Sequence, residues 1–175
     1  EGYLSSQDQD LGRLIQQYGS CPFLQDNAQS NLFDRLTNSI IGQQLSVKAA
    51  GSIRAVLLAR ATSEVFSPAF FLSTAPEDLR AYGLSTAKAN TLREISTKIR
   101  NDPDFLTRMD SLPSEEIEHT LCGIKGIGPW TAKMFQMFAL RRLDIFAPED
   151  AGLMRGIRIT YSDGKSIDPA GIESI

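Results

Sequence analysis

The stretch that most constrains the fold is CGIKGIGPWTAKM at residues 122–134, which sets three glycines and a proline between an apolar run and a helix-forming run. Glycine tolerates positive φ and lets another backbone approach closely, and it recurs here at Gly123, Gly126 and Gly128. Pro129 stands where the first position of a helix is expected. The stretch therefore predicts a tight hairpin over residues 123–129 between two helices.

Apolar spacing predicts the two helices that flank this hairpin. Upstream, SLPSEEIEHTLC at residues 111–122 predicts a short helix with Ser114 as its N-cap and Gly123 as its stop. Downstream, Pro129 opens a helix that runs to about residue 140. Its apolar positions are Trp130, Met134, Met137, Phe138 and Leu140.

Most of the remaining chain also has the apolar period of helices. Further helices are predicted over residues 11–18, 32–41, 46–59 with Ser46 as cap, and 85–100. A capping box from Thr74 to Glu77 predicts another helix, which stops at Gly83. One stretch, IRITYSDGKSI at residues 157–167, alternates like a strand before an Asp-Gly turn. We therefore expect an all-α fold, as one domain or two small lobes, with at most one strand.

Composition and charge limit the possible function classes. The 175 residues include 42% hydrophobic residues, enough to bury a core, and no apolar run approaches the roughly 20 residues of a membrane span. We expect a soluble, intracellular protein without a membrane partner. Cys21, Cys122 and His119 have no metal-ligand spacing, and we expect no cofactor. The net charge of −3 means that any contact with nucleic acid must be local.

The hairpin is a candidate for such a local contact. Backbone N–H groups left unpaired at the start of the helix from Pro129 lie at the positive end of its dipole, which favours phosphate. Lys125 in the loop and Lys133 one turn into the helix add positive charge. From glycine spacing alone, an ordinary connection between helices remains the alternative.

A second informative segment is FAPEDAGLMRGI at residues 146–157. An acidic residue behind a proline and ahead of a helical run is most often an N-cap, and Glu149 fits that description. This segment also completes a resemblance that covers about residues 30–157. The motifs NSIIGQQLSVKAA, IKGIGPWTAKMF and DIFAPEDAGLMRG resemble those of the helix-hairpin-helix DNA glycosylases, and most closely the DNA-3-methyladenine glycosylases of the yeast and bacterial type.

The resemblance implies the two-lobe helical fold of this family, with DNA held at the hairpin between the lobes. It also implies a monofunctional enzyme that hydrolyses the N-glycosidic bond of alkylated purines such as 3-methyladenine and leaves an abasic site. The family's catalytic aspartate aligns with Asp150, whose charge would stabilise an oxocarbenium-like sugar. Trp130 aligns with a pocket position where an aromatic face attracts a cationic base, and Met134 stands where some relatives carry an aromatic ring.

The DNA contacts of the family carry over in the same way. In the GQQLS loop, Gln44 aligns with the wedge that fills the gap left by a flipped base, and Gln43 is its support. A solvated turn is the alternative for this loop. The implied DNA-binding set is Gln43, Gln44, Ser46, Lys48, Lys125, Gly126, Ile127, Gly128, Thr131 and Lys133. A monovalent cation at the backbone carbonyls of Ile124 and Gly126 is one further candidate.

We expect residues 1–175 to form one glycosylase domain that ends short of the helices that follow the catalytic aspartate in the family. The expected partner is double-stranded DNA containing alkylated bases, bound by a monomer, in the nucleus of a eukaryote or the cytoplasm of a bacterium. Two alternatives stay open. One is a non-catalytic DNA-binding module in which Asp150 is only a cap. The other is a bifunctional glycosylase and lyase, although its iron–sulfur branch needs four cysteine ligands and this sequence has two cysteines.

Overall fold

The structure is a computed structural model that describes residues 1–19, 21 and 31–162. Two compact units are distinguished by their internal contacts. Residues 30–147 form the first, here called the core unit, and residues 1–29 with 148–175 form the second, the terminal unit. The described residues contain helices and connecting segments but no strand, which confirms the all-α prediction.

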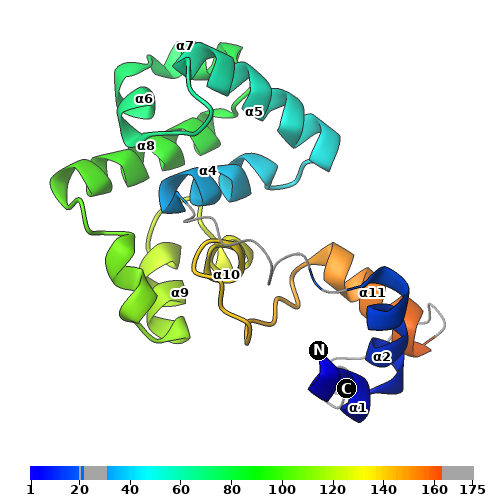
Figure 1. Cartoon of the computed structure of the whole chain (residues 1–175). Coiled ribbons are helices and arrows are strands. Elements are labelled where there is room, and N and C mark those ends of the chain that lie inside the picture. Colours follow the sequence, from blue (N-terminus) through cyan, green and yellow to red (C-terminus); the bar gives the residue numbers. More distant parts are fainter. Residues whose placement is uncertain (20, 22–30, 163–175) are drawn as a thin grey trace. The chain divides into compact units, whose positions relative to one another are not determined.

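The core unit is built around one central helix, α4 (Leu32–Gly42), which packs against α5, α8 and α10 (Figure 1). The other helices of the unit are α5 (Val47–Ala61), α6 (Pro68–Ser73), α7 (Pro76–Ala81), α8 (Thr86–Asn101), the 3₁₀ helix η1 (Thr107–Ser111), α9 (Ser114–Cys122) and α10 (Pro129–Phe138). Apolar side chains at helical spacing fill the space between them, including Leu36, Ile40, Leu92 and Phe135, which are fully buried. Each such burial stabilises the fold by about 1.5–3 kcal/mol.

The terminal unit contains α1 (Gly2–Gln7), α2 (Gln9–Tyr18) and α11 (Ala151–Ser162). Not one residue of these three helices is buried. The carboxylate of Asp8 caps α2 by accepting hydrogen bonds from the N–H groups of Asp10 and Leu11, at 2.7 and 3.0 Å. The hydroxyl of Tyr161, on α11, donates to the other oxygen of the same carboxylate at 2.6 Å. This polar contact thus joins α11 to the N-cap of α2.

The strand prediction for residues 157–167 was wrong over residues 157–162, which belong to α11. The remaining residues of that stretch lie outside the described ranges. Ile157 and Ile159 alternate, but Met154, Ile157 and Tyr161 also have the spacing of one helical face, and these three side chains are half-buried whereas Ile159 is exposed. Helical spacing, and not the alternation of the isoleucines, therefore describes residues 157–162.

Two predicted N-caps were also wrong, because the side chains concerned form hydrogen bonds with other groups. Thr74 and Glu77 form no capping box, since the Thr74 hydroxyl donates to the carbonyl of Phe70 at 2.7 Å and α7 begins one residue later than that box requires. Ser114 is the first residue of α9 instead of its N-cap. Its hydroxyl accepts a hydrogen bond from Arg142 at 2.8 Å.

None of the helices in the described ranges combines the length and the apolar composition that a bilayer span requires.

Candidate functional site

The hairpin predicted at residues 123–129 connects α9 to α10. Only one of its three glycines needs the freedom of glycine, because Gly126 has φ +93°. Gly123 and Gly128 have φ values of −66° and −107°, which other residues adopt readily. The positive φ that glycine tolerates is therefore required at one of the three positions.

Buried groups hold this hairpin from the inside. Ile124 and Ile127 insert into the core, with exposed fractions of 1% and 5%. The hydroxyl of Thr91, on α8, donates to the carbonyl of Lys125 at 2.8 Å. A Cβ atom at position 126 would overlap that hydroxyl, so Gly126 is needed for packing as well as for its φ angle. Thr91 was missed from sequence because the contact spans 34 residues.

The outer side of the hairpin presents backbone donors. Among the described residues, the N–H groups of Lys125, Gly126 and Gly128 donate to no protein acceptor, whereas that of Ile127 donates to the carbonyl of Ile124 at 3.0 Å. These groups precede the 10-residue helix α10, which begins at Pro129. The Lys125 side chain is exposed beside them. Such an array of donors at the positive end of a helix dipole suits an anion.

Within the described ranges, the two carbonyls named for a monovalent cation each accept one hydrogen bond. The carbonyl of Ile124 accepts from Ile127, and the carbonyl of Gly126 accepts from the side chain of Gln43. A carbonyl oxygen has two lone pairs, so one on each remains available to a cation. The cation stays a prediction. In the described ranges, no cluster of three or more His, Cys, Asp or Glu side chains has the arrangement of a metal site.

A hydrogen-bonded joint connects the hairpin to the loop at residues 43–46, here called the QQLS loop. The side-chain amide of Gln43 donates to the carbonyl of Gly126 at 3.0 Å and to the hydroxyl of Thr131, in the first turn of α10, at 2.9 Å. The next residue, Gln44, is exposed and has φ +56°. Two segments 83 residues apart in sequence therefore lie side by side, with the Gln44 side chain in solvent.

The same loop is held on its other side by Lys88, on α8. Its ammonium donates to the carbonyls of Ile41 and Gln43, both at 2.8 Å, at the C-terminal end of α4. Burial lowers the pKa of Lys88. No local pattern predicts this role for Lys88, because its partners lie 47 and 45 residues away.

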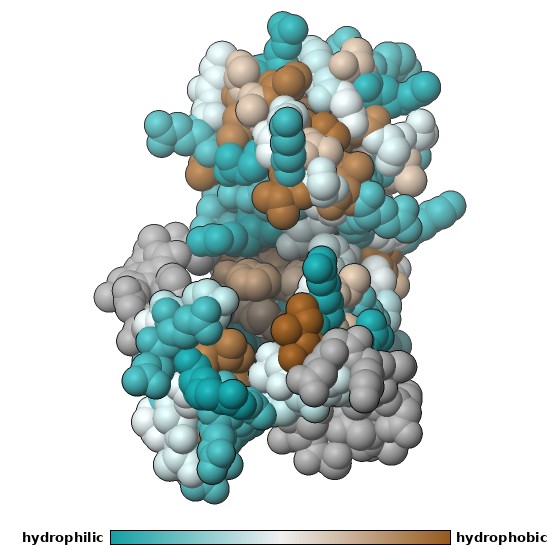
Figure 2. All heavy atoms as spheres, turned by 90° about the vertical axis from the view of Figure 1, so that its right-hand side faces the viewer, coloured by the Kyte–Doolittle hydropathy of each residue, from teal (hydrophilic) through white to brown (hydrophobic). Residues whose placement is uncertain are grey.

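The QQLS loop ends where α5 begins. Ser46 caps that helix as predicted, with its hydroxyl accepting from the N–H of Ala49 at 3.2 Å, and Lys48 is exposed in the first turn. Leu45 and Val47 are exposed as well, Val47 to 92%. Figure 2 shows the side of the molecule where α4 runs into α5, and its hydrophobic patches there are separated by hydrophilic side chains.

Trp130 and Met134 lie one turn apart on α10 and therefore on the same face of that helix. Trp130 is half-buried, whereas Met134 is only 7% exposed. Lys133, on the same helix, is half-buried.

Asp150 lies in the terminal unit and caps α11. Its carboxylate accepts a hydrogen bond from the N–H of Leu153 at 2.8 Å, and its carbonyl accepts from the N–H of Met154 at 2.9 Å. Glu149, which was expected to be the cap, is one residue too early, because the helix begins at Ala151. The carboxylate of Asp150 lies at the positive end of the α11 dipole.

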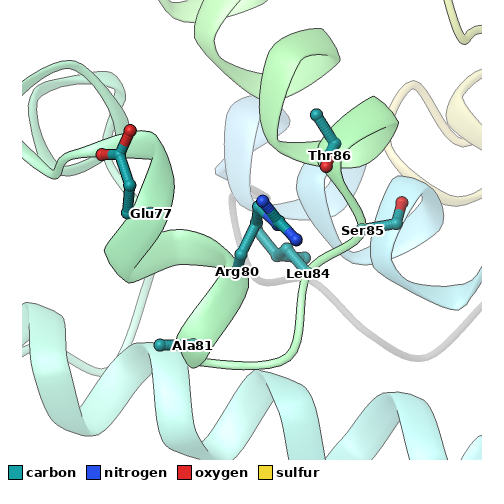
Figure 3. A pocket seen from close by; sticks show the side chains of 6 residues that line it. All are labelled: Glu77, Arg80, Ala81, Leu84, Ser85 and Thr86. Atoms are coloured by element: carbon teal, nitrogen blue, oxygen red, sulfur yellow. The ribbon is translucent and has the colours of Figure 1, made fainter.

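A hollow of about 650 Å³ opens on the core unit at the start of α8 (Figure 3). It is lined by Glu77, Arg80, Ala81, Leu84, Ser85 and Thr86. Figure 3 shows the guanidinium of Arg80 on the side of Ser85 and Thr86, with Glu77 apart from it. None of the predicted site residues lines this hollow.

Comparison with protein families places this arrangement of hairpin and loop in a known group. The family model of the HhH-GPD superfamily base excision DNA repair proteins matches residues 37–174. The chain belongs to the HhH-GPD superfamily. This assignment confirms the resemblance drawn from the motifs, and the matched range includes the QQLS loop, the hairpin and Asp150.

Individual HhH-GPD relatives agree with the family match. The chain is 33% identical over 150 residues to the DNA-3-methyladenine glycosylase of Saccharomyces cerevisiae, which covers 81% of this chain and 51% of that protein. The chain thus spans about half the length of this relative. A solved DNA-3-methyladenine glycosidase from Bacillus halodurans has TM-score 0.78 and 30% identity, covering 98% of this chain and 77% of that one. A Schizosaccharomyces pombe 3-methyladenine DNA glycosylase in complex with abasic DNA has TM-score 0.82 and 25% identity, with coverages of 98% and 84%.

Proposed function

We propose that this chain is a DNA glycosylase that hydrolyses the N-glycosidic bond of alkylated purines such as 3-methyladenine in double-stranded DNA and leaves an abasic site. The names of the relatives support the reaction. The observation that carries the proposal is the joint made by Gln43, because it brings an exposed glutamine loop against a hairpin with free backbone donors. A surface of this kind suits a duplex with one nucleotide turned out of the stack.

In this proposal the hairpin binds phosphate. The N–H groups of Lys125, Gly126 and Gly128 donate to a phosphate oxygen, and Lys125 and Lys133 add charge. The side chain of Gln44 enters the duplex and fills the gap left by the flipped base, while Gln43 holds the loop in place. Ser46 and Lys48 contact the sugar–phosphate backbone of the DNA in the same region.

The flipped base is proposed to meet Trp130 and Met134. An alkylated purine carries positive charge, and an aromatic face attracts a cation by about 0.5–2 kcal/mol. Met134 adds a polarizable, adaptable contact. Asp150 supplies the negative charge that stabilises the developing oxocarbenium ion at the sugar or orients a water toward it.

A second candidate function is a DNA-binding module without catalysis. The hydrogen bond from the Leu153 N–H to the Asp150 carboxylate favours it, because this bond gives Asp150 a structural role that needs no chemistry. The two functions differ in what Asp150 contributes once DNA is bound.

The substitution Asp150→Asn separates them. Asparagine keeps an oxygen that accepts from Leu153, so the cap of α11 remains, but the charge is lost. We expect single-turnover excision of 3-methyladenine from a methylated duplex to fall at least about 100-fold, with affinity for an abasic duplex unchanged or higher. A variant with wild-type excision would contradict the catalytic assignment, and a wild-type chain that binds DNA without excising any base from a panel of alkylated, deaminated and oxidised duplexes would favour the binding module.

The proposed enzyme does not cut the DNA strand. A lyase uses an amine that attacks the sugar C1′ and forms a Schiff base, and at the family's position for that lysine this chain has Trp130. Lys133 is three residues further along α10, nearly a full turn away. Borohydride treatment of the enzyme with damaged duplex should trap no covalent adduct, and strand breaks should appear only after alkali. Trapping that disappears in Lys133→Ala would instead make that lysine the nucleophile.

We further propose that the protein acts on DNA as a monomer, in the nucleus if its source is a eukaryote and in the cytoplasm if it is a bacterium.

A further inference from the structure

We propose that Lys88 is a positioning residue for base excision: its ammonium, bonded to the carbonyls of Ile41 and Gln43, holds the QQLS loop in the conformation in which Gln44 enters the duplex. The inference rests on the proposed function, and it assigns a role to a residue that lies outside the motifs of the family resemblance.

The first support is the geometry of the contact. Helix α4 ends at Gly42, and its last carbonyls have no partner within the helix. A lysine ammonium has three donors and no acceptor, and two of these donors reach carbonyls at 2.8 Å. The cation comes from α8, which also contacts the hairpin through Thr91, one turn further along. One face of α8 therefore fixes both segments proposed to contact DNA.

The second support is the backbone at Gln44. Its φ of +56° lies in the left-handed region, which a residue other than glycine keeps only where its surroundings hold it. The carbonyl of Gln43 belongs to the peptide group that leads into Gln44, and Lys88 fixes that carbonyl. The turn is closed by the N–H of Leu45, which donates to the carbonyl of Gly42 at 3.1 Å. Without the ammonium, the turn loses the contact that orients its central peptide.

The third support is a comparison along the same helix. Arg93 also donates from α8 to main-chain carbonyls, those of Phe71 and Thr74, at 2.7 and 2.8 Å. These carbonyls lie at the end of α6 and in the connection to α7, which carry no predicted site residue. The two cations make the same kind of contact, so Arg93 is a matched control for the general stability that such a contact supplies.

The experiment compares Lys88→Met, Lys88→Arg and Arg93→Met in the full chain. Single-turnover excision is measured for one alkylated purine in a fully paired duplex and for the same base in a bulge, where less unstacking must be sustained. We expect Lys88→Met to lose about 10- to 100-fold on the paired duplex and much less on the bulge. Lys88→Arg should recover most of the loss, because a guanidinium can also donate to the two carbonyls. Arg93→Met should lower the midpoint of thermal unfolding and leave the ratio of the two rates as in the wild type.

A double variant tests whether Lys88 acts through Gln44. Gln44→Ala alone should show the same preference for the bulge, and adding Lys88→Met should cause little further loss, since residues that act as one unit are not additive. Equal losses on the two substrates for Lys88→Met, or additive losses in the double variant, would overturn the proposal.

A readout without chemistry keeps this test separate from the proposed function. A duplex with a non-cleavable abasic analogue and a neighbouring 2-aminopurine brightens when a side chain enters the stack. If the wild type brightens this probe but excises no base, the glycosylase proposal fails while Lys88→Met is still tested by the lost fluorescence. If the wild type neither brightens the probe nor excises a base, Gln44 is no wedge and the role of Lys88 is overturned as well.

Discussion

The two units of this chain keep their helices in place by different means. The core unit packs fully buried side chains such as Leu36, Leu92 and Phe135 between its helices. The three helices of the terminal unit bury no residue completely, and the contact between Asp8 and Tyr161 is polar. The segments proposed to grip DNA thus stand on a tightly packed scaffold, whereas Asp150, proposed to perform the chemistry, stands on a helix held by half-buried and polar contacts.

This difference predicts where substitutions act. Interiors are close-packed, so a change in the core unit disturbs many neighbours at once. Half-buried side chains at the surface lose fewer contacts on truncation. Hydrogen exchange should therefore show stronger protection for α4, α8 and α10 than for α11.

The largest effect is expected from a truncation in the core. Phe135→Ala removes a fully buried ring from α10 and should lower the free energy of unfolding by about 3–5 kcal/mol. Ile157→Ala, on the half-buried face of α11, should cost much less. Denaturant unfolding with exchange read out at single residues measures both. Equal costs would break the contrast between the two units.

The two glycines of the hairpin should differ in a way that sharpens the same contrast. Gly126→Ala places a side chain at φ +93° against the Thr91 hydroxyl and should destabilise the core unit by about 1–3 kcal/mol. Gly128→Ala meets open space at an ordinary φ, so stability should be unchanged. Its added methyl group should still weaken binding to damaged and undamaged duplex alike, because phosphate contacts do not read sequence. Wild-type affinity of Gly128→Ala across a salt titration would mean that close phosphate approach needs no glycine there.

The smallest effect concerns pH and the terminal unit. Burial and the hydrogen bond to Asp8 raise the pKa of Tyr161 to about 12, from an ordinary value of 10.0. A raised pKa means that this contact stabilises the folded state below pH 10 and that the contribution is lost as pH rises toward 12. The same hydrogen bond lowers the pKa of Asp8, so its contribution is present above pH 3.8 and lost as pH falls through the lowered value.

Comparing the wild type with Tyr161→Phe isolates this contact. The difference in stability between the two proteins should be constant from about pH 4 to pH 10 and should shrink on either side. Absorbance of tyrosinate during the titration should show one tyrosine fewer ionising late in the variant. A difference that does not change with pH would show that the hydroxyl contributes nothing to the docking of α11.

Elements with local signals were predictable from the sequence, and contacts between distant segments were not. The hairpin, α10 and the cap at Ser46 follow from glycine, proline and apolar spacing within about ten residues. The roles of Lys88 and Thr91 depend on how α8 packs against α4 and the hairpin, which no neighbouring residue encodes.

Two errors have a similar origin. The capping box at Thr74 failed because the carbonyl of Phe70, at the preceding helix end, takes the hydroxyl. The strand at residues 157–162 was wrong because Ile157 and Ile159 alternate within a helix, where Ile157 lies on the half-buried face and Ile159 is exposed. The predicted roles of Asp150, Gln44 and Trp130 rest on the family resemblance, and they remain predictions.

The joint at Gln43 also bears on how the chain folds. The bonds from Gln43 to Gly126 and from Lys88 to Ile41 close chain segments of 83 and 47 residues, whereas each helix and the hairpin form from near neighbours. Long-range closure is slow because chain entropy must be lost before the contact forms. The hydrogen bond from Ile127 to Ile124 inside the hairpin is local, but we expect the surface that combines the hairpin with the QQLS loop to be complete only when the core has packed. A nascent or partly unfolded chain that already has its helices would still lack this surface. Binding of damaged DNA through this surface would therefore require the completed fold.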